Sequence, residues 1–463
     1  MNNQVIFDKD LISRYDCSGP RYTSYPTAVQ FSTEYGPEDY CEWVDNSNND
    51  PIPTALSLYL HIPFCDTICY YCGCSKIVTK DKDKAPAYID LLKKEIALQG
   101  ALFDKDRPVT QIHWGGGTPT FLDNESIRDI FDTIKQHFNV PAGDSGEFGI
   151  EVDPRTVDEE RIAQLRNIGF NRISFGVQDF DPDVQEAVNR VHTKEQIMEA
   201  INAARKNNFH SINIDLMYGL PRQTLKSFEK TIQTTIDASP DRIAVYNYAH
   251  LPEMFKPQRR INEDELPSAE EKLKILQLTI DKLQQAGYVY IGMDHFAKQS
   301  DDLTKAQQEG TLHRNFQGYS THADCDTVAM GITAISSIGD NYSQNVRTIE
   351  DYKMHIEQGK IPVFRGIELE SDDILRREII NQLMCNNKLD IERLEQRWGI
   401  EFKKYFASAL PALQTMATDG LIIMDDQHIE ITASGRLLAR TICMEFDRYL
   451  KKDSLKQHFS KVI

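Results

Sequence analysis

The sequence lacks any long apolar run, and its basic residues are outnumbered by acidic ones. No stretch approaches the roughly 18 apolar residues that a membrane-spanning helix needs. The opening residues, MNNQVIFDKD, lack the basic and then apolar pattern of a signal peptide. Asp and Glu number 70 against 52 Lys and Arg, a net charge of −18 that repels nucleic-acid backbones and anionic membranes. We therefore expect a cytoplasmic protein that binds neither a membrane nor nucleic acid.

Cysteine is scarce, and its distribution is uneven. The chain has nine cysteines, of which four, Cys65, Cys69, Cys72 and Cys74, lie within ten positions. An odd number of cysteines with four so close together does not resemble a disulfide framework. This usage agrees with a reducing compartment, in which thiols stay available to bind a metal.

Beyond residue 50, short apolar runs rich in β-branched residues alternate with helical patterns. The runs cover residues 55–64, 109–117, 146–154, 172–178, 211–221 and 242–250. Apolar residues recur at helical spacing near residues 85–103, 124–138, 158–167, 194–207, 225–237 and 268–286. Strands that alternate with helices build a parallel sheet. We predict an α/β fold with strands buried on both faces, arranged as a partial (β/α)6 barrel or a strongly curved open sheet.

The length of the chain indicates more than one structural unit, because 463 residues exceed one core of ordinary size. We predict an N-terminal arm over residues 1–50, a catalytic domain over residues 51–363 and a mainly helical C-terminal domain with a small hairpin over residues 364–463. Helices followed by a hairpin also suit a winged-helix reader of DNA, but the chain has no basic recognition stripe. A structural or lid-forming role fits the C-terminal domain better.

The spacing of the clustered cysteines favours an iron–sulfur cluster. Cys65, Cys69 and Cys72 form a C-x3-C-x2-C pattern directly after the first predicted strand. Three thiolates on three corners of a [4Fe-4S] cluster leave the fourth iron open to another ligand. The alternative is a zinc site, which usually combines two separate C-x2-C pairs, and the sequence holds no second pair.

Several motifs resemble those of the radical S-adenosylmethionine (SAM) superfamily. Besides the cysteine pattern, the motifs GPRYTSYPT, GGGTPT, FGVQDF, NYAHLP, HRNFQGYST and AISSIGD are similar to those of one of its families, the oxygen-independent coproporphyrinogen III oxidases (coproporphyrinogen dehydrogenases) of haem biosynthesis. The resemblance spans nearly the whole chain. It implies that Cys65, Cys69 and Cys72 bind the cluster, whose open iron takes SAM. Cys74 matches a family cysteine that is not a ligand, and it is either close to the chemistry or a small buried residue without a chemical role.

The resemblance also implies two bound SAM molecules. The matching positions are Tyr59, Tyr71, Gly116, Gly117, Thr118, Glu151, Gln178, Arg190, Asp215, Ala249 and Ile335. For the glycines, the alternative is a tight turn that needs a positive φ. For the charged residues, the alternative is a set of structural ion pairs, since a buried carboxylate needs a partner. His192 departs from the family pattern, which usually has Gln at this position.

The substrate that the resemblance implies is a reduced tetrapyrrole with four propionates. Arg21, Tyr22 and Arg314 are the residues that we expect to hold those carboxylates, with surface salt bridges as the alternative. The implied reaction removes CO2 from the propionates of rings A and B by means of a 5′-deoxyadenosyl radical, and it needs an electron donor that the sequence does not identify. We assign no catalytic acid or base, and we expect a monomer.

A haem-binding chaperone on the same scaffold is the main alternative function. Relatives of that kind commonly have Phe where Cys74 stands and lack the GPRYTSYPT arm, and both features of this sequence oppose it.

Overall fold

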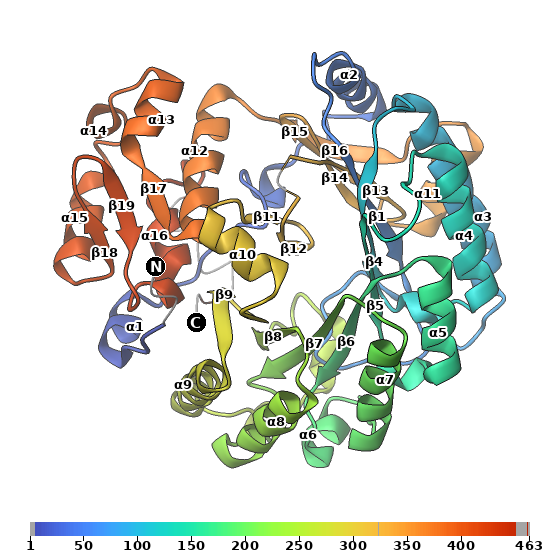
Figure 1. Cartoon of the computed structure of the whole chain (residues 1–463), viewed down its shortest axis with the longest axis horizontal. Coiled ribbons are helices and arrows are strands. Elements are labelled where there is room, and N and C mark those ends of the chain that lie inside the picture. Colours follow the sequence, from blue (N-terminus) through green and yellow to red (C-terminus); the bar gives the residue numbers. More distant parts are fainter. Residues whose placement is uncertain (1–4, 323, 451–460, 462–463) are drawn as a thin grey trace.

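A curved sheet of twelve strands forms the centre of the molecule (Figure 1). The computed structural model describes residues 5–322, 324–450 and 461. The parallel strands of the repeating units are β1 (Leu56–Ile62), β4 (Val109–Gly116), β5 (Glu147–Val152), β6 (Arg172–Gln178), β7 (Ser211–Tyr218) and β8 (Arg242–Asn247). They correspond to the six predicted runs, so the predicted α/β fold with a partial barrel is confirmed.

Strands from the later part of the chain extend both edges of the sheet. β13 (Asp326–Met330) pairs with β1 in parallel, and the antiparallel strands β14 (Ile335–Ile338), β15 (Asn341–Asn345) and β16 (Val363–Glu368) follow it. At the other edge, β10 (His295–Lys298) runs antiparallel to β8, and β9 (Tyr288–Gly292) runs antiparallel to β10. The sheet order begins at β16 and ends at β9, so the barrel is open.

Helices cover the outer, convex face of the sheet (Figure 1). They are α3 (Lys84–Leu102), α4 (Asn124–His137), α5 (Glu159–Ile168), α7 (Lys194–Lys206), α8 (Leu225–Ala238) and α9 (Ala269–Gln285). The shorter helix α6 (Pro182–Ala187) precedes α7 in the connection from β6 to β7. Two other short helices, α10 (Asp302–Glu309) and α11 (Ile349–Glu357), follow β10 and β15 in sequence. Several of these helices begin at polar side chains that cap the first turn, such as Asp158 in α5 and Thr193 in α7.

The two faces of the strands differ in chemistry. In β6, buried Ile173, Phe175 and Val177 alternate with half-buried Ser174 and Gln178. Side chains alternate between the faces of a strand, so the apolar set packs under the helices and the polar set faces the hollow of the barrel. The prediction that the strands are buried on both faces therefore holds for β1, in which every residue but the half-buried Tyr59 is buried. It is wrong for β6 and β7, whose inner faces line a cavity.

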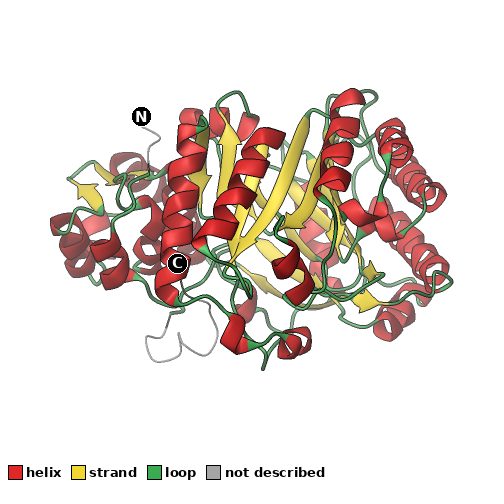
Figure 2. Cartoon of the chain, turned by 90° about the horizontal axis from the view of Figure 1, so that it is seen from below, coloured by secondary structure: helices red, strands yellow, loops and turns green. Residues whose placement is uncertain are grey.

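The C-terminal residues form a second core beside the sheet. Its helices are α12 (Ser371–Asn381), α13 (Ile391–Trp398), α14 (Phe402–Tyr405), α15 (Leu410–Thr418) and α16 (Ala439–Met444). Its small sheet contains β17 (Lys388–Asp390), β19 (His428–Ile431) and β18 (Ile422–Met424), and Figure 2 shows it at one end of the molecule, away from the large sheet. β18 and β19 are the predicted hairpin, to which β17 adds a third strand.

The N-terminal arm contributes to both cores. Helix α2 (Pro37–Asn48) places Tyr40 and Val44 in the core of the large sheet. The segment between α1 (Lys9–Tyr15) and α2 places Tyr22 and Tyr25 in the core of the C-terminal residues. Among the described residues, no helix is both long and apolar enough to cross a bilayer.

Candidate functional site

The cysteine loop is anchored at the carboxyl end of β1. The short strands β2 (Phe64–Cys65) and β3 (Ile77–Val78) pair with each other and close the loop at its base. The backbone N–H of Thr118, which follows β4, donates to the carbonyl of Phe64 at 2.8 Å. Lys76 donates from Nζ to the carbonyls of Cys72 and Cys74, at 3.1 and 3.3 Å. The Thr118 bond holds the base of the loop against the end of β4, and the Lys76 bonds tie the loop to itself.

A cavity of about 520 Å³ lies between this loop and the inner face of the barrel. It brings together twelve residues that the sequence predicts for the site, from segments far apart in the chain. These are Cys65, Cys69, Tyr71, Cys72, Cys74, Gly116, Gly117, Thr118, Glu151, Gln178, Arg190 and Asp215. Most of them lie at or just beyond the carboxyl ends of parallel strands, where parallel α/β folds bind their ligands.

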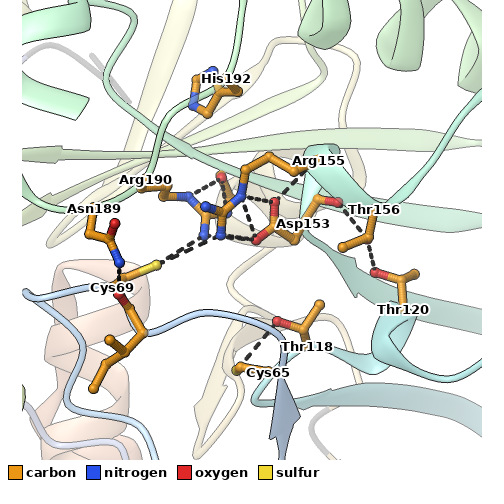
Figure 3. Close-up of polar contacts among 12 residues, drawn as sticks. Cys65, Cys69, Thr118, Thr120, Asp153, Arg155, Thr156, Asn189, Arg190 and His192 are labelled. Atoms are coloured by element: carbon orange, nitrogen blue, oxygen red, sulfur yellow. Dashed lines mark hydrogen bonds and ion pairs between the residues drawn. The ribbon is translucent and has the colours of Figure 1, made fainter. Parts of the chain in front are cut away.

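An ion-pair network connects the third and fourth strands to the cysteine loop (Figure 3). Asp153 accepts from Arg155 at 2.6 Å and from Arg190 at 3.0 Å. Arg190 also donates from Nη1 to the Cys69 sulfur at 3.4 Å and from Nε to the carbonyl of Gly176 at 3.0 Å. Burial by itself would raise the pKa of Asp153, but the two guanidinium groups outweigh it and lower that pKa to about 2. A fixed positive charge therefore lies beside the Cys69 thiol.

The donor set of the loop fits an iron–sulfur cluster. All nine cysteines are free, and Cys65, Cys69 and Cys72 line the same cavity. A hydrogen bond from Cys74 lowers the pKa of Cys72 to about 6, which favours the thiolate that a metal binds. Among the described residues, no three His, Cys, Asp or Glu side chains converge as one ion would require. A cluster binds its thiolates at separate iron corners, so it does not need that convergence.

The wall opposite the cysteines carries polar groups suited to a zwitterionic ligand. Burial, and to a lesser degree the nearby Glu151 carboxylate, raises the pKa of Asp215 to about 6. Ser174 donates to the Asp215 carboxylate at 2.9 Å, while the Gln178 side-chain oxygen is buried without a hydrogen-bond partner among the described residues. A buried amide oxygen without a hydrogen bond destabilises the folded protein, and a bound ligand would supply the missing donor.

Gly116 and Gly117 have a steric reason as well as a ligand-binding one. A Cβ atom at Gly117 would lie 2.6 Å from the carbonyl oxygen of Pro63, and one at Gly116 would lie 2.6 Å from the ring of His61. Gly116 also has a φ of +112°, which favours glycine. Both glycines therefore belong to a tight turn, which was the alternative interpretation of the sequence. They also line the cavity, so the two interpretations hold together.

Three residues predicted to contact SAM do not line the cysteine cavity. Tyr59 stacks on His113, and its hydroxyl lies 3.1 Å from Nδ1 of His61. Ala249 lines a different cavity near α9, and Ile335 packs beside a cluster that contains Phe31. Their roles stay predictions. His192 does not line the cysteine cavity either, because its ring points to the carbonyl of Val177, 3.0 Å from Nε2.

The three residues predicted to hold substrate carboxylates differ in their partners. Arg21 forms an ion pair with Asp294, and the Tyr22 hydroxyl donates to Asp447 at 3.0 Å. Arg314 is buried, and its Nε and Nη1 atoms have no hydrogen-bond partner among the described residues. Of the two arginines, Arg314 is therefore the one whose guanidinium has no ion-pair partner among the described residues.

The sequence reasoning missed four residues of the site. Asp153 and Arg155 lie two and four positions after Glu151 and form the ion-pair network. His113 lies 3.1 Å from Glu151, and Lys76 binds the carbonyls of the cysteine loop. His113 lies two positions before Gly115 in β4, and residues two apart in a strand lie on the same face of the sheet. This spacing was the signal in the sequence that the His113 side chain points inward. Nothing local in the sequence indicates that Asp153 would join Arg190, 37 residues further on.

Comparison with known proteins identifies the family. Residues 59–235 match the Radical SAM superfamily, and residues 369–438 match the HemN C-terminal domain. An oxygen-independent coproporphyrinogen III oxidase of Pseudomonas aeruginosa is 51% identical over 463 residues, which are 100% of both chains. The chain belongs to this family. A second oxygen-independent coproporphyrinogen III oxidase, from Salmonella typhimurium, is 48% identical over 99% of both chains.

A solved structure agrees with this assignment. The coproporphyrinogen III oxidase (HemN) of Escherichia coli, described as a radical SAM enzyme, is 47% identical and superposes with a TM-score of 0.91, covering 96% of this chain and 100% of that one. The chain is thus a coproporphyrinogen III oxidase of the radical SAM class, an oxidoreductase of haem biosynthesis. That class implies a [4Fe-4S] cluster and SAM, which sets the zinc alternative aside.

Proposed function

We propose that this coproporphyrinogen III oxidase converts the propionates of rings A and B into vinyl groups, with protoporphyrinogen IX as the product. The observation that carries the proposal is the cavity in which the three predicted cluster thiols face Glu151, Gln178 and Asp215. When bound there, the cluster and SAM would supply a 5′-deoxyadenosyl radical, which would take a hydrogen atom from the β-carbon of a propionate. CO2 would then leave, and one electron would pass from the substrate radical to a separate electron acceptor.

The residues of the chain would position these groups and would not act as acids or bases. Cys65, Cys69 and Cys72 would hold the cluster, with the Arg190 guanidinium compensating negative charge beside Cys69. Two SAM molecules would bind between the cysteine loop and the barrel, with the Gln178 oxygen as one acceptor for an ammonium or hydroxyl group. Cys74 lies next to the cluster loop and would stay unligated, with a thiol that donates to Cys72.

The setting of the reaction follows from the same observations. The nine free cysteines support the cytoplasm as the compartment, because a reducing environment keeps such thiols unpaired. Electrons must come from a separate donor, since the proposed reaction uses one electron for each SAM that is cleaved. We expect the chain to work as a monomer and to bind no nucleic acid, in line with its charge of −18.

An anaerobic assay tests the proposal directly. The protein with a reconstituted cluster is incubated with dithionite, SAM and coproporphyrinogen III, and mass spectrometry follows the products. We expect 5′-deoxyadenosine together with two successive losses of CO2 and two hydrogens. Deoxyadenosine without any decarboxylation would contradict the proposed substrate, and it would favour the haem-binding chaperone.

Single Cys-to-Ser variants test the ligand assignment. We expect Cys65→Ser, Cys69→Ser and Cys72→Ser to lose most of the bound iron and the broad visible absorbance, because each removes one of three thiolates. Cys74→Ser should keep both the iron and the absorbance. Cys325→Ser is the matched control, because Cys325 lies on another cavity. Loss of the cluster in Cys74→Ser, or its retention in Cys69→Ser, would refute the assignment.

A further inference from the structure

Arg314 is a buried cation without a counter-ion among the described residues. It lies on β11 (His313–Asn315), which pairs with β12 (Gly318–Ser320) in a short hairpin. The residue is 6% exposed, and its guanidinium stacks over the ring of Tyr319 at 4.8 Å. Within the described part of the chain, no group forms a hydrogen bond with Nε or Nη1 of Arg314. An unpaired buried guanidinium is expensive to desolvate, so its presence indicates that an anion completes the site.

The surrounding cavity has room for such an anion. It measures about 290 Å³ and lies between the N-terminal arm, the β11–β12 hairpin and α12. Ser24 of the arm also lines it, and the Ser24 hydroxyl is buried without a partner among the described residues. A hydroxyl that lines the same cavity as the guanidinium provides a further donor for a carboxylate.

The acidic side chains of this cavity do not neutralise Arg314. Asp326 pairs with Arg107 at 2.6 Å, and Asp340 pairs with Arg377 at 2.6 Å. Asp324, the remaining acid of the lining, is exposed to solvent. The positive charge of Arg314 is therefore available to a ligand.

Three neighbouring cavities lie in series between Arg314 and the cysteine loop. A middle cavity of about 150 Å³ shares Asn315 and Gln317 with the Arg314 cavity. The middle cavity shares Glu151, Ser174, Asp215 and Tyr246 with the cysteine cavity. The two outer cavities have no lining residue in common. A ligand with several carboxylates can therefore have one end at the cysteine loop and the other at Arg314.

We propose that Arg314, with Ser24, binds the propionate on the ring opposite to the ring that is being converted. This rests on the proposed function, in which rings A and B react. Ring C lies opposite ring A, and ring D lies opposite ring B, so an unconverted propionate reaches Arg314 in both turnovers. A third turnover, on ring C or D, would place a vinyl group against the buried guanidinium. The Arg314 site thus limits the reaction to two decarboxylations.

Binding measurements with porphyrins test the site without relying on turnover. Fluorescence titration of the protein with a reconstituted cluster uses coproporphyrin III, which has four propionates, and deuteroporphyrin IX, which keeps those of rings C and D. We expect Arg314→Met to weaken the binding of both by about 30-fold or more, because a buried charge-assisted contact is lost. Arg314→Lys should recover part of this loss, since it keeps the charge. Unchanged affinity for deuteroporphyrin IX in Arg314→Met would overturn the proposal.

A control variant separates this proposal from a general structural effect. Arg161→Met removes another arginine whose buried Nε lacks a partner among the described residues, from a position that lines none of these three cavities. It should leave porphyrin affinity within about twofold of the wild type, within the scatter expected for residues that do not contact the ligand. An equal loss in both variants would mean a general structural effect and would contradict the assignment to Arg314.

Product analysis then tests the limit of two. After prolonged anaerobic turnover, the wild type should stop after two losses of CO2, whereas Arg314→Met should react more slowly and proceed to a detectable third loss. A variant that also stops at two would refute Arg314 as the limiting residue. If the wild type binds porphyrins through Arg314 but decarboxylates nothing, the proposed function fails while the carboxylate site stands.

Discussion

Asp153 links the two arginines of the site, and its burial makes this link strong. The residue is 7% exposed and lies within 3.0 Å of both guanidinium groups. Because its pKa is lowered to about 2, the carboxylate stays ionised at neutral pH. It compensates the charge of Arg190, whose side chain then reaches Cys69.

Replacing Asp153 tests this role. Asp153→Asn should lower the free energy of unfolding at pH 7 by about 3 kcal/mol, because it leaves the buried Arg190 and the half-buried Arg155 without their carboxylate. Urea denaturation measures the loss. Asp144→Asn is the matched control, since Asp144 pairs with Arg166 at the surface, and it should cost less than about 1 kcal/mol. Equal losses in the two variants would contradict the role of Asp153.

The pH dependence of that effect has a definite sign. The folded pKa of Asp153 is lower than the ordinary value of 3.8, so its ionisation stabilises the fold above that pH. The stabilisation is lost as the pH falls from about 4 towards 2. The difference between the wild type and Asp153→Asn should therefore shrink below pH 4.

At the scale of elements, Glu95 joins helix α3 to three later segments. Its buried carboxylate accepts from the backbone N–H of Gly331 at 2.7 Å, from Asn345 at 2.8 Å and from the hydroxyl of Tyr352. These residues follow β13, end β15 and lie in α11. Burial raises the pKa of Glu95 to about 7, even though the three hydrogen bonds oppose that rise.

A pH series tests this junction. The unfolded carboxyl loses its proton near the ordinary value of 4.5 and the folded one near 7, so the wild type loses stability as the pH rises between these values. Glu95→Gln stays neutral. The free energy of unfolding of the variant, relative to the wild type, should therefore rise by about 3 kcal/mol between pH 4.5 and pH 8. Glu125→Gln is the matched control at an exposed position, and its stability should vary with pH as that of the wild type does. If the stability of Glu95→Gln also varied with pH as in the wild type, the proposed contribution of Glu95 would be refuted.

At the scale of the whole molecule, the arm connects the C-terminal core to the rest of the chain. Tyr25 is 2% exposed, belongs to that core and accepts a hydrogen bond from the backbone N–H of Arg448 at 3.0 Å. Ser24, next to it, lines the Arg314 cavity. The C-terminal core therefore stabilises the arm segment that closes one wall of the proposed substrate site.

Removal of the Tyr25 side chain tests this coupling. Tyr25→Ala should cost about 3 to 5 kcal/mol of local stability, as large-to-small core substitutions do. Hydrogen exchange should become faster in α12 and α16, with little change in β4 to β7. Tyr40→Ala is the matched control, because Tyr40 packs in the first core and donates to Gln99 of α3. Faster exchange in α12 after Tyr40→Ala, but not after Tyr25→Ala, would contradict the coupling.

The local pattern of the sequence determined the strands, the helices and the spacing of the clustered cysteines. The alternation of apolar residues along β6 and their helical spacing along α4 involve only residues a few positions apart. The periodicity of the sequence therefore predicts both elements. The C-x3-C-x2-C spacing is local in the same sense. Twelve of the predicted site residues accordingly line one cavity.

Only the tertiary structure decided which distant groups meet. Asp153 joins Arg190, and Arg190 meets Cys69 across 121 residues of sequence. The same packing pairs Arg21 with Asp294 but leaves Arg314 without a counter-ion among the described residues. The physical reason is that a buried charge depends on partners supplied by other segments, and the curvature of the sheet determines which segments come together.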